Sequence, residues 1–117
     1  MINSYKDLIV WQKSFQLVKK IYKVTEKFPH SEIYGLTSQM RRASISMPSN
    51  IAEGFVRKHT KEFSQFISIA FGSGAELETQ LLLVKELGYI TEEKFKELDP
   101  LLLEIMKVLN SLLSKLK

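Results

Sequence analysis

Glycine and proline are scarce in this 117-residue chain, and their positions constrain its fold more than any other feature. The chain has five glycines and three prolines. Pro29, Gly35 and Gly88 fall between long segments that read as helices. No segment of useful length shows the apolar–polar alternation of a half-buried β-strand. The sequence therefore predicts an all-α fold in which long helices are joined by short connections.

The first two helices are predicted from the residues that would end them. The first runs from Lys6 to Lys27 and stops before Pro29, because a residue that precedes proline is disfavoured in the helical region. The second begins near Leu36 and ends near Gly54, read as a C-terminal glycine. Pro48 lies inside this helix and removes one backbone hydrogen bond, so a bend is expected there.

The third and fourth helices complete the predicted fold. The third begins after Thr60 and runs to Gly88. Thr91 is the expected N-cap of the fourth, which Pro100 either kinks or splits. Short turns between four helices favour antiparallel neighbours. We expect one domain over residues 1–117, an up-down-up-down four-helix bundle.

Positive charge is concentrated near the N-terminus. The net charge is +4. Residues 1–30 carry six lysines and two acidic residues, whereas the rest of the chain holds eleven basic and eleven acidic residues. A basic segment of this kind attracts nucleic acid, anionic lipid or an acidic protein.

Several classes of protein are excluded or disfavoured by composition. The chain has no cysteine, which excludes disulfides and thiolate metal sites and fits a reducing cytoplasm. Its first residues include charged side chains, unlike a signal peptide, and no apolar run reaches membrane-spanning length. We therefore expect a cytoplasmic protein without a membrane partner.

Motifs for catalysis or cofactor binding are absent from the sequence. The two histidines, His30 and His59, lie in expected connections, and neither follows a glutamate at the spacing of a di-iron site. No phosphate-binding or dinucleotide-binding glycine motif occurs. Small residues at 72–75 are expected to let another helix approach closely. The prediction is a protein with no catalytic residue, metal or cofactor.

Two predicted helices carry more apolar surface than one small bundle needs. On the first helix, two adjacent apolar stripes are spaced at about 100° per residue. They comprise Leu8, Trp11, Phe15, Val18 and Tyr22, and Val10, Leu17, Ile21, Val24 and Phe28. The third helix also has apolar residues outside its main stripe, including Ile69, Leu82, Leu83 and Leu87. Large exposed apolar patches mark interaction sites, so a homo-oligomer is expected; the alternative is a monomer with wide apolar faces.

A row of polar side chains follows one face of the second helix. Its members are Gln39, Arg42, Ser46, Asn50 and Glu53, and the third helix offers Gln65, Glu76 and Gln80. One interpretation is a hydrogen-bonded seam between helices or subunits, in which Arg42 pairs with Glu76 or Glu53. The other is a ligand or RNA site.

A stripe of lysines on the first helix is the candidate nucleic-acid contact. The residues proposed to contact phosphates are Lys13, Lys19, Lys20, Lys23 and Lys27, with Arg57, Lys58 and Lys61 in the turn before the third helix. Such contacts are largely independent of base sequence and sensitive to salt. The alternatives are a solvated lysine face, or a scaffold that docks a partner protein such as a nucleic-acid enzyme.

Three segments carry a family resemblance. They are YGLTSQMRRASISMPSNIAEG (34–54), FSQFISIAFGSGAELETQL (63–81), and DLIVWQKSFQL (7–17), with LGYI at 87–90. Together they resemble the bacterial four-helix-bundle family described as 23S rRNA intervening sequence proteins. The resemblance implies a ring-like homopentamer, often encoded within inserts in ribosomal RNA genes. It extends to the accessory protein of diversity-generating retroelements, a basic pentamer that binds a reverse transcriptase and nucleic acid. Gly74 and Pro100 depart from the usual pattern.

Overall fold

A computed structural model describes residues 1–116 as four long helices without a β-strand. Their bounds are α1 (Ile9–Thr25), α2 (Leu36–Arg57), α3 (Thr60–Glu86) and α4 (Glu92–Lys115). Two 3₁₀ turns, η1 (Tyr5–Asp7) and η2 (His30–Glu32), precede α1 and α2. The predicted all-α fold of four helices is confirmed. None of the helices in the described part of the chain combines the length and apolarity that crossing a membrane requires.

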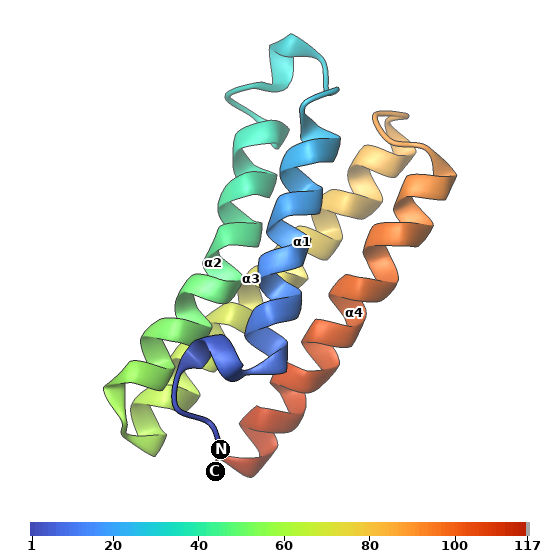
Figure 1. The fold of residues 1–117 in the computed structure, drawn as a ribbon. Helices are drawn as coiled ribbons and strands as arrows, with labels where there is room; N and C mark the ends of the chain where they lie inside the picture. Colours follow the sequence, from blue (N-terminus) through green and yellow to red (C-terminus); the bar gives the residue numbers. More distant parts are fainter. Residues whose placement is uncertain (117) are drawn as a thin grey trace.

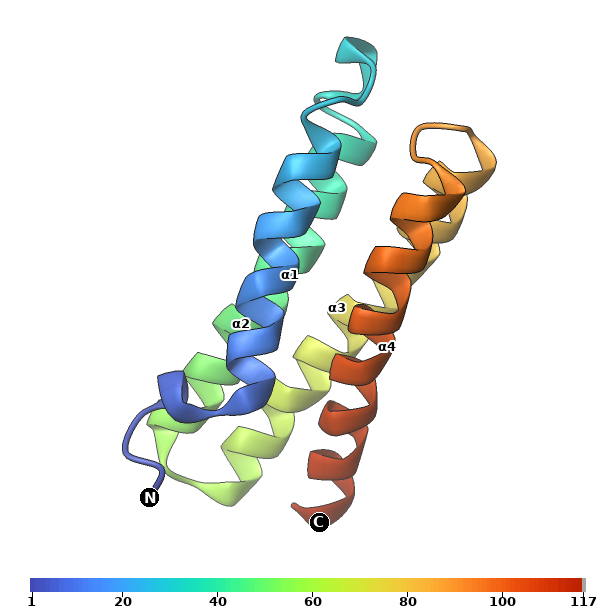
Figure 2. The ribbon, with the colours of Figure 1, turned by 45° about the vertical axis from the view of Figure 1, so that its right-hand side comes forward.

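The helices lie side by side in an elongated molecule of 42 × 24 × 22 Å. In Figure 1, each helix starts at the end of the molecule where the preceding helix stops, and the two termini lie at the same end. Figure 2 shows α1 beside α2 and α4 beside α3. Since α1 and α3 both contact α2 and α4, they occupy diagonal corners of the bundle.

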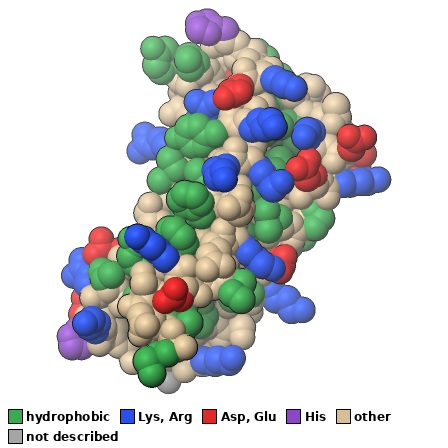
Figure 3. All heavy atoms as spheres, in the orientation of Figure 1, with side chains coloured by type: hydrophobic (Ala, Val, Ile, Leu, Met, Phe, Trp, Pro, Cys, Tyr) green, Lys and Arg blue, Asp and Glu red, His purple; other side chains and the backbone are tan. Residues whose placement is uncertain are grey.

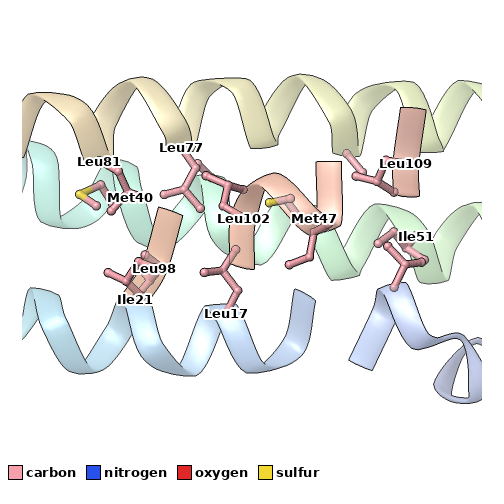
Figure 4. Packing of buried hydrophobic residues seen from close by; sticks show 14 of the residues in the cluster. Leu17, Ile21, Met40, Met47, Ile51, Leu77, Leu81, Leu98, Leu102 and Leu109 are labelled. Atoms are coloured by element: carbon pink, nitrogen blue, oxygen red, sulfur yellow. The ribbon is translucent and has the colours of Figure 1, made fainter. Parts of the chain in front are cut away.

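The core runs along the bundle axis and receives side chains from all four helices (Figure 4). Its fully buried members recur every three or four residues, which places them on one face of each helix. Those labelled in Figure 4 are Leu17, Ile21, Met40, Met47, Ile51, Leu77, Leu81, Leu98, Leu102 and Leu109. The candidate functional residues therefore lie on the helix faces that point away from this core.

The first helix begins later than Lys6, because a separate capped turn precedes it. The Ser4 hydroxyl accepts a hydrogen bond from the Lys6 amide at 3.1 Å, and the Asp7 carboxylate accepts one from the Ser4 amide at 3.1 Å. This capping box stabilises η1. Leu8 is then extended, so α1 starts at Ile9.

The end of α2 at Gly54 was wrongly predicted. The helix continues through Pro48 and past Gly54 to Arg57, and Lys58 ends it in the left-handed conformation with φ 62°. Gly54 is buried, and a Cβ there would lie 2.8 Å from the Cβ of Phe66. This glycine therefore allows α2 and α3 to approach, and it does not terminate the helix.

The start of α4 agrees with the sequence prediction, whereas the predicted break at Pro100 does not occur. The Thr91 hydroxyl accepts a hydrogen bond from the Lys94 amide at 3.1 Å, which confirms the N-cap. Because α4 runs unbroken through Pro100, the split helix was a wrong alternative. On α3, a Cβ at Gly74 would meet the side chains of Met106 and Met47, not a helix backbone.

Candidate nucleic-acid interface

A groove of about 550 Å³ lies between the C-terminal half of α1 and the N-terminal half of α4. The connection at residues 89–91 closes one of its ends. The ionic residues that line it are Lys19, Lys20, Lys23, Lys27 and Lys94, with Glu93 and Glu97. Five lysines against two glutamates leave a surplus of three positive charges. The groove therefore attracts anions.

Helical spacing explains why three of these lysines come from α1, namely Lys19, Lys20 and Lys23. Lys19 and Lys23 are four residues apart, or about 6 Å along the helix, and Lys27 follows in the turn after α1, which ends at Thr25 and not at Lys27 as predicted. Leu17 and Ile21 occupy the core-facing side of the same helix and are fully buried. Burial of that apolar side therefore holds the lysines at the solvent boundary, where Figure 3 shows basic side chains gathered over the upper part of the molecule.

Glu97 offsets part of this positive charge. Its carboxylate oxygens lie 3.2 Å from the Nζ of Lys20 and 3.2 Å from the Nζ of Lys94. The hydrogen bonds from Lys20 and Lys94 lower the pKa of Glu97 below its usual value. Glu97 is thus ionised at neutral pH and occupies two of the five groove lysines.

Lys13 lies outside the groove and has its own partner on α4. It forms an ion pair with Glu104, and the Lys20–Glu97 pair repeats this arrangement farther along the same two helices. Two of the predicted phosphate contacts therefore also join α1 to α4. Within residues 1–116, Lys19, Lys23 and Lys27 take part in no ion pair.

The other three predicted phosphate contacts lie at the opposite end of the molecule. Arg57 ends α2, Lys58 follows it, and Lys61 lies in the first turn of α3. This α2–α3 connection is at the lower end of Figure 1, whereas the groove lies toward the upper end. The Arg57 guanidinium is engaged by Glu53 at 3.1 Å and Glu62 at 3.4 Å. The eight basic residues predicted from sequence thus divide into four in the groove, three at the opposite end of the molecule, and Lys13 on α1 outside both groups.

The polar row of α2 meets α3 in a hydrogen-bonded seam. The hydroxyl oxygens of Ser46 and Ser73 lie 2.8 Å apart. The Asn50 amide donates to the Ser46 carbonyl at 2.7 Å and to its hydroxyl at 2.9 Å. The sequence prediction included Ser73 only among the small residues at 72–75. Ser73 lies three residues before Glu76 and seven before Gln80 and so shares their helix face, which was the signal that it could belong to this seam.

The charged members of the row do not pair as predicted. Among the described residues Arg42 forms no ion pair, whereas Glu53 pairs with Arg57. Arg42 and Glu76 instead line a shallow polar groove of about 460 Å³, together with Gln39, Ser38, Ser46 and Ser73. Within one described chain, therefore, Arg42 pairs with neither Glu53 nor Glu76, and the predicted pairing across a subunit contact stays a prediction.

Gln80 is the most buried polar residue of the predicted seam, with 6% of its surface exposed. Its Oε1 accepts no hydrogen bond from the described chain. A buried acceptor without a donor costs about 1–3 kcal/mol. The hydrogen-bonded part of the seam in the described chain is therefore confined to Ser46, Asn50 and Ser73.

Apolar side chains remain exposed on α1 and α3. On α1, the rings of Trp11 and Phe15 stack at 5.1 Å, and the Arg41 guanidinium of α2 lies 4.4 Å from the ring centre of Tyr22. We call the exposed Phe15 and Tyr22, with the partly buried Trp11, the α1 strip. Ile69 and Leu83 of α3 and Leu87, which directly follows the helix, are exposed, and we call them the α3 strip. Both strips extend beyond the core of a single chain.

Residues that could hold a metal do not gather in the described part of the chain. No group of three or more histidine, cysteine or carboxylate side chains has metal-binding geometry within residues 1–116. His30 lies in η2, and His59 directly precedes α3. Both histidines therefore lie in connections, where the sequence placed them.

Comparison with known proteins places the chain by family and by fold. A crystal structure of a protein of unknown function from the S23 ribosomal protein family of Bacteroides thetaiotaomicron superposes with a TM-score of 0.83. That match has 24% identity and covers 91% of this chain and 96% of the other, so it shows a shared fold. A comparison with curated proteins gives no match. The family model of the 23S rRNA-intervening sequence proteins matches residues 6–111. The chain therefore belongs to the 23S rRNA-intervening sequence protein family.

Proposed function

We propose that this protein binds nucleic acid as a non-enzymatic homo-oligomer and that the lysine groove between α1 and α4 contacts the phosphate backbone. The observation that carries the proposal is the presence of five lysines in one groove, of which three lie outside the ion pairs of the described chain. Phosphates bound by lysine release counterions, which makes affinity dependent on salt. The cytoplasm, where nucleic acid is available, is the proposed location.

Assembly of antiparallel bundles into a ring multiplies a weak positive field. One chain carries +4, so a pentamer carries about +20, which steers a polyanion toward the ring. Several grooves that engage one polymer also bind it more tightly than one groove does. The pentamer is the assembly that the family resemblance implies, and the exposed apolar strips support self-association.

A scaffold that docks a partner protein is the second candidate function. The observation that favours it is the exposure of the aromatic side chains Phe15 and Tyr22 on α1, because aromatic residues are enriched in protein interfaces. The partner would be a nucleic-acid enzyme, recruited by the bundle without direct contact between the bundle and RNA. Co-purification from the native host separates the functions, since a stoichiometric protein without RNA supports the scaffold.

Fluorescence anisotropy with labelled RNA and DNA tests the groove. Lys23→Gln with Lys27→Gln removes two groove charges, whereas Lys58→Gln with Lys61→Gln removes two charges at the other end. We expect the groove variant to bind more weakly and to lower the slope of log affinity against log salt by about 2, measured from about 50 to 200 mM salt.

The matched double variant at the α2–α3 turn is expected to retain most of the affinity. Equal losses in the two double variants would assign binding to general positive charge and not to the groove. Wild-type affinity that does not change with salt, or no binding at low salt, would contradict the proposed function.

A further inference from the structure

The two sides of the groove between α1 and α4 differ in charge. The α1 side, with the turn that follows the helix, contributes four lysines and no acidic residue. The α4 side contributes Glu93, Lys94 and Glu97, two negative charges against one positive and hence a net charge of −1. A phosphate is therefore attracted to the α1 side and repelled by the α4 side.

Apolar side chains lie between these two sides. Val24 of α1 and Leu98 of α4 line the groove, together with Tyr89 and Ile90 of the α3–α4 connection. We call these four residues the groove floor. Leu98 and Ile90 belong to the buried core, whereas Val24 and Tyr89 are only partly buried. A ligand in the groove thus has lysines on one side, carboxylates on the other and an apolar surface beneath it.

The Tyr89 part of the groove floor is held by two contacts. The Tyr89 hydroxyl donates a hydrogen bond to the Glu32 carboxylate at 3.0 Å, and the ring centre lies 5.5 Å from that of Phe28. A side chain that is already ordered loses little conformational freedom when a ligand binds. This part of the floor is therefore prepared for contact with a flat apolar group.

Glu93 is an available hydrogen-bond acceptor on the α4 side. Within residues 1–116 it takes part in no ion pair, whereas Glu97 is engaged by Lys20 and Lys94. A carboxylate accepts hydrogen bonds from a base amino group such as that of cytosine, but it repels a phosphate. The α4 side therefore suits the edge of a base better than it suits the backbone of a nucleic acid.

A single strand of nucleic acid matches this order of properties, and a duplex does not. Unpaired bases of a single strand expose faces that pack on apolar and aromatic side chains, and their edges are free for hydrogen bonds. In a duplex the bases are paired with one another, and both strands carry phosphates on the outside. Phosphates of the second strand would then approach the α4 glutamates.

We infer that the groove binds a single strand of nucleic acid in preference to a duplex, an inference that rests on the proposed function of the groove. The phosphates follow the α1 lysines, while the bases lie on the groove floor with their edges toward Glu93. The groove volume of about 550 Å³ lies within the range of small-ligand sites, about 300–1,000 Å³. Each copy therefore holds only a short stretch of the strand.

Three probes test this inference by fluorescence anisotropy with the full chain. They are an unstructured single strand of DNA, its duplex with the complementary strand, and an abasic strand of the same length. The single strand is expected to bind about tenfold more tightly than the duplex, although attraction by charge alone predicts the reverse, because a duplex has the higher charge density. The abasic strand is expected to bind about tenfold more weakly than the single strand.

The salt dependence separates the contribution of the bases from that of the phosphates. The normal and abasic strands carry the same phosphates, so their slopes of log affinity against log salt are expected to be equal. The difference in affinity between the two strands is then expected to persist at every salt concentration at which both strands bind.

A pair of valine variants on α1 tests the groove floor. Val24→Ala removes part of the floor, whereas Val18→Ala makes the same change at a partly buried position outside the groove. Val24→Ala is expected to weaken binding of the single strand about two- to threefold and to leave binding of the duplex and the abasic strand unchanged. Val18→Ala is expected to bind all three probes like wild type. Circular dichroism establishes that both variants are folded.

The outcomes distinguish this inference from the proposed function. A duplex that binds as tightly as the single strand would overturn the inference, as would an abasic strand with undiminished affinity or a folded Val24→Ala variant that binds the single strand like wild type. The proposed phosphate contacts would survive these results if Lys23→Gln with Lys27→Gln still weakened binding. Absence of binding for every probe at low salt would overturn the proposed function and the inference together.

Discussion

Gly54 and Gly72 both lie within helices but differ in the space around the missing side chain. A Cβ at Gly54 would lie 2.8 Å from the Cβ of Phe66 and 3.0 Å from the Phe63 ring, whereas nothing lies within 4 Å of a Cβ at Gly72. Gly54→Ala is therefore expected to lower the free energy of unfolding by about 1–3 kcal/mol. Gly72→Ala is expected to raise it by about 0.5–1 kcal/mol, because alanine favours the helix.

Urea unfolding followed by circular dichroism measures both glycine variants. Gly72→Ala is the control for Gly54→Ala, because the chemical change is the same and only the surroundings of the added methyl group differ. Effects of equal sign would contradict the close approach of α2 and α3 at Gly54.

Asp99 is expected to make stability depend on pH. Its Oδ1 is buried without a donor among the described residues, and desolvation raises the pKa of the carboxyl above its usual value, while Lys85 opposes the shift. The folded state thus holds this proton more tightly than the unfolded state. The contribution of Asp99 to stability is present below the unfolded pKa of about 3.9 and is lost as pH rises through the folded pKa.

Asp99→Asn removes this ionisation while nearly preserving the shape of the side chain. The variant is expected to gain stability relative to wild type at pH 7 and to lose that advantage near pH 3, because Asp99 is protonated there in both states. Denaturant unfolding at the two pH values measures the difference. An identical difference at both values would show that ionisation of Asp99 is not coupled to folding.

Helices α1 and α4 are joined by ion pairs that also limit the charge of the groove. Removal of the Glu97 carboxylate by Glu97→Gln frees Lys20 and Lys94 for a bound phosphate. The RNA affinity is expected to increase by up to about fivefold, which corresponds to about 1 kcal/mol. Fluorescence anisotropy at constant salt measures the change.

Glu104→Gln is the matched control for Glu97→Gln. Glu104 also lies on α4 and pairs with a lysine of α1, but its partner Lys13 lies outside the groove. Its affinity is expected to stay closer to that of wild type. An equal increase in both variants would indicate a response to net charge, without a specific role for the groove.

Self-association of the whole molecule is expected to appear as concentration-dependent stability. Partners that bind only the folded state raise its stability as their concentration rises. The Tm of the wild type should therefore increase between about 1 and 100 μM, while the Tm of Phe15→Asp should stay constant. A wild-type Tm that is independent of concentration over this range would contradict assembly.

Features set by residues close in sequence were predictable. The spacing of seven and four residues between Val10, Leu17 and Ile21 places them on one helix face, and all three are buried. The Thr91 cap depends on an amide only three residues away. The end of α2 was not predictable in this way, because the role of Gly54 depends on Phe66, which belongs to another helix.

The sequence by itself determined four helices and the apolar face of each, because both follow from a backbone period of 3.6 residues and from local caps. Only the tertiary structure decided which helices became neighbours. The contact between α1 and α4 pairs Lys13 with Glu104, which is 91 residues away in the sequence, and Lys20 with Glu97, which is 77 residues away. The tertiary structure also separated Arg57, Lys58 and Lys61 from the α1 lysines. The physical reason is that core packing fixes the contacts between helices, and no local pattern of charge specifies them.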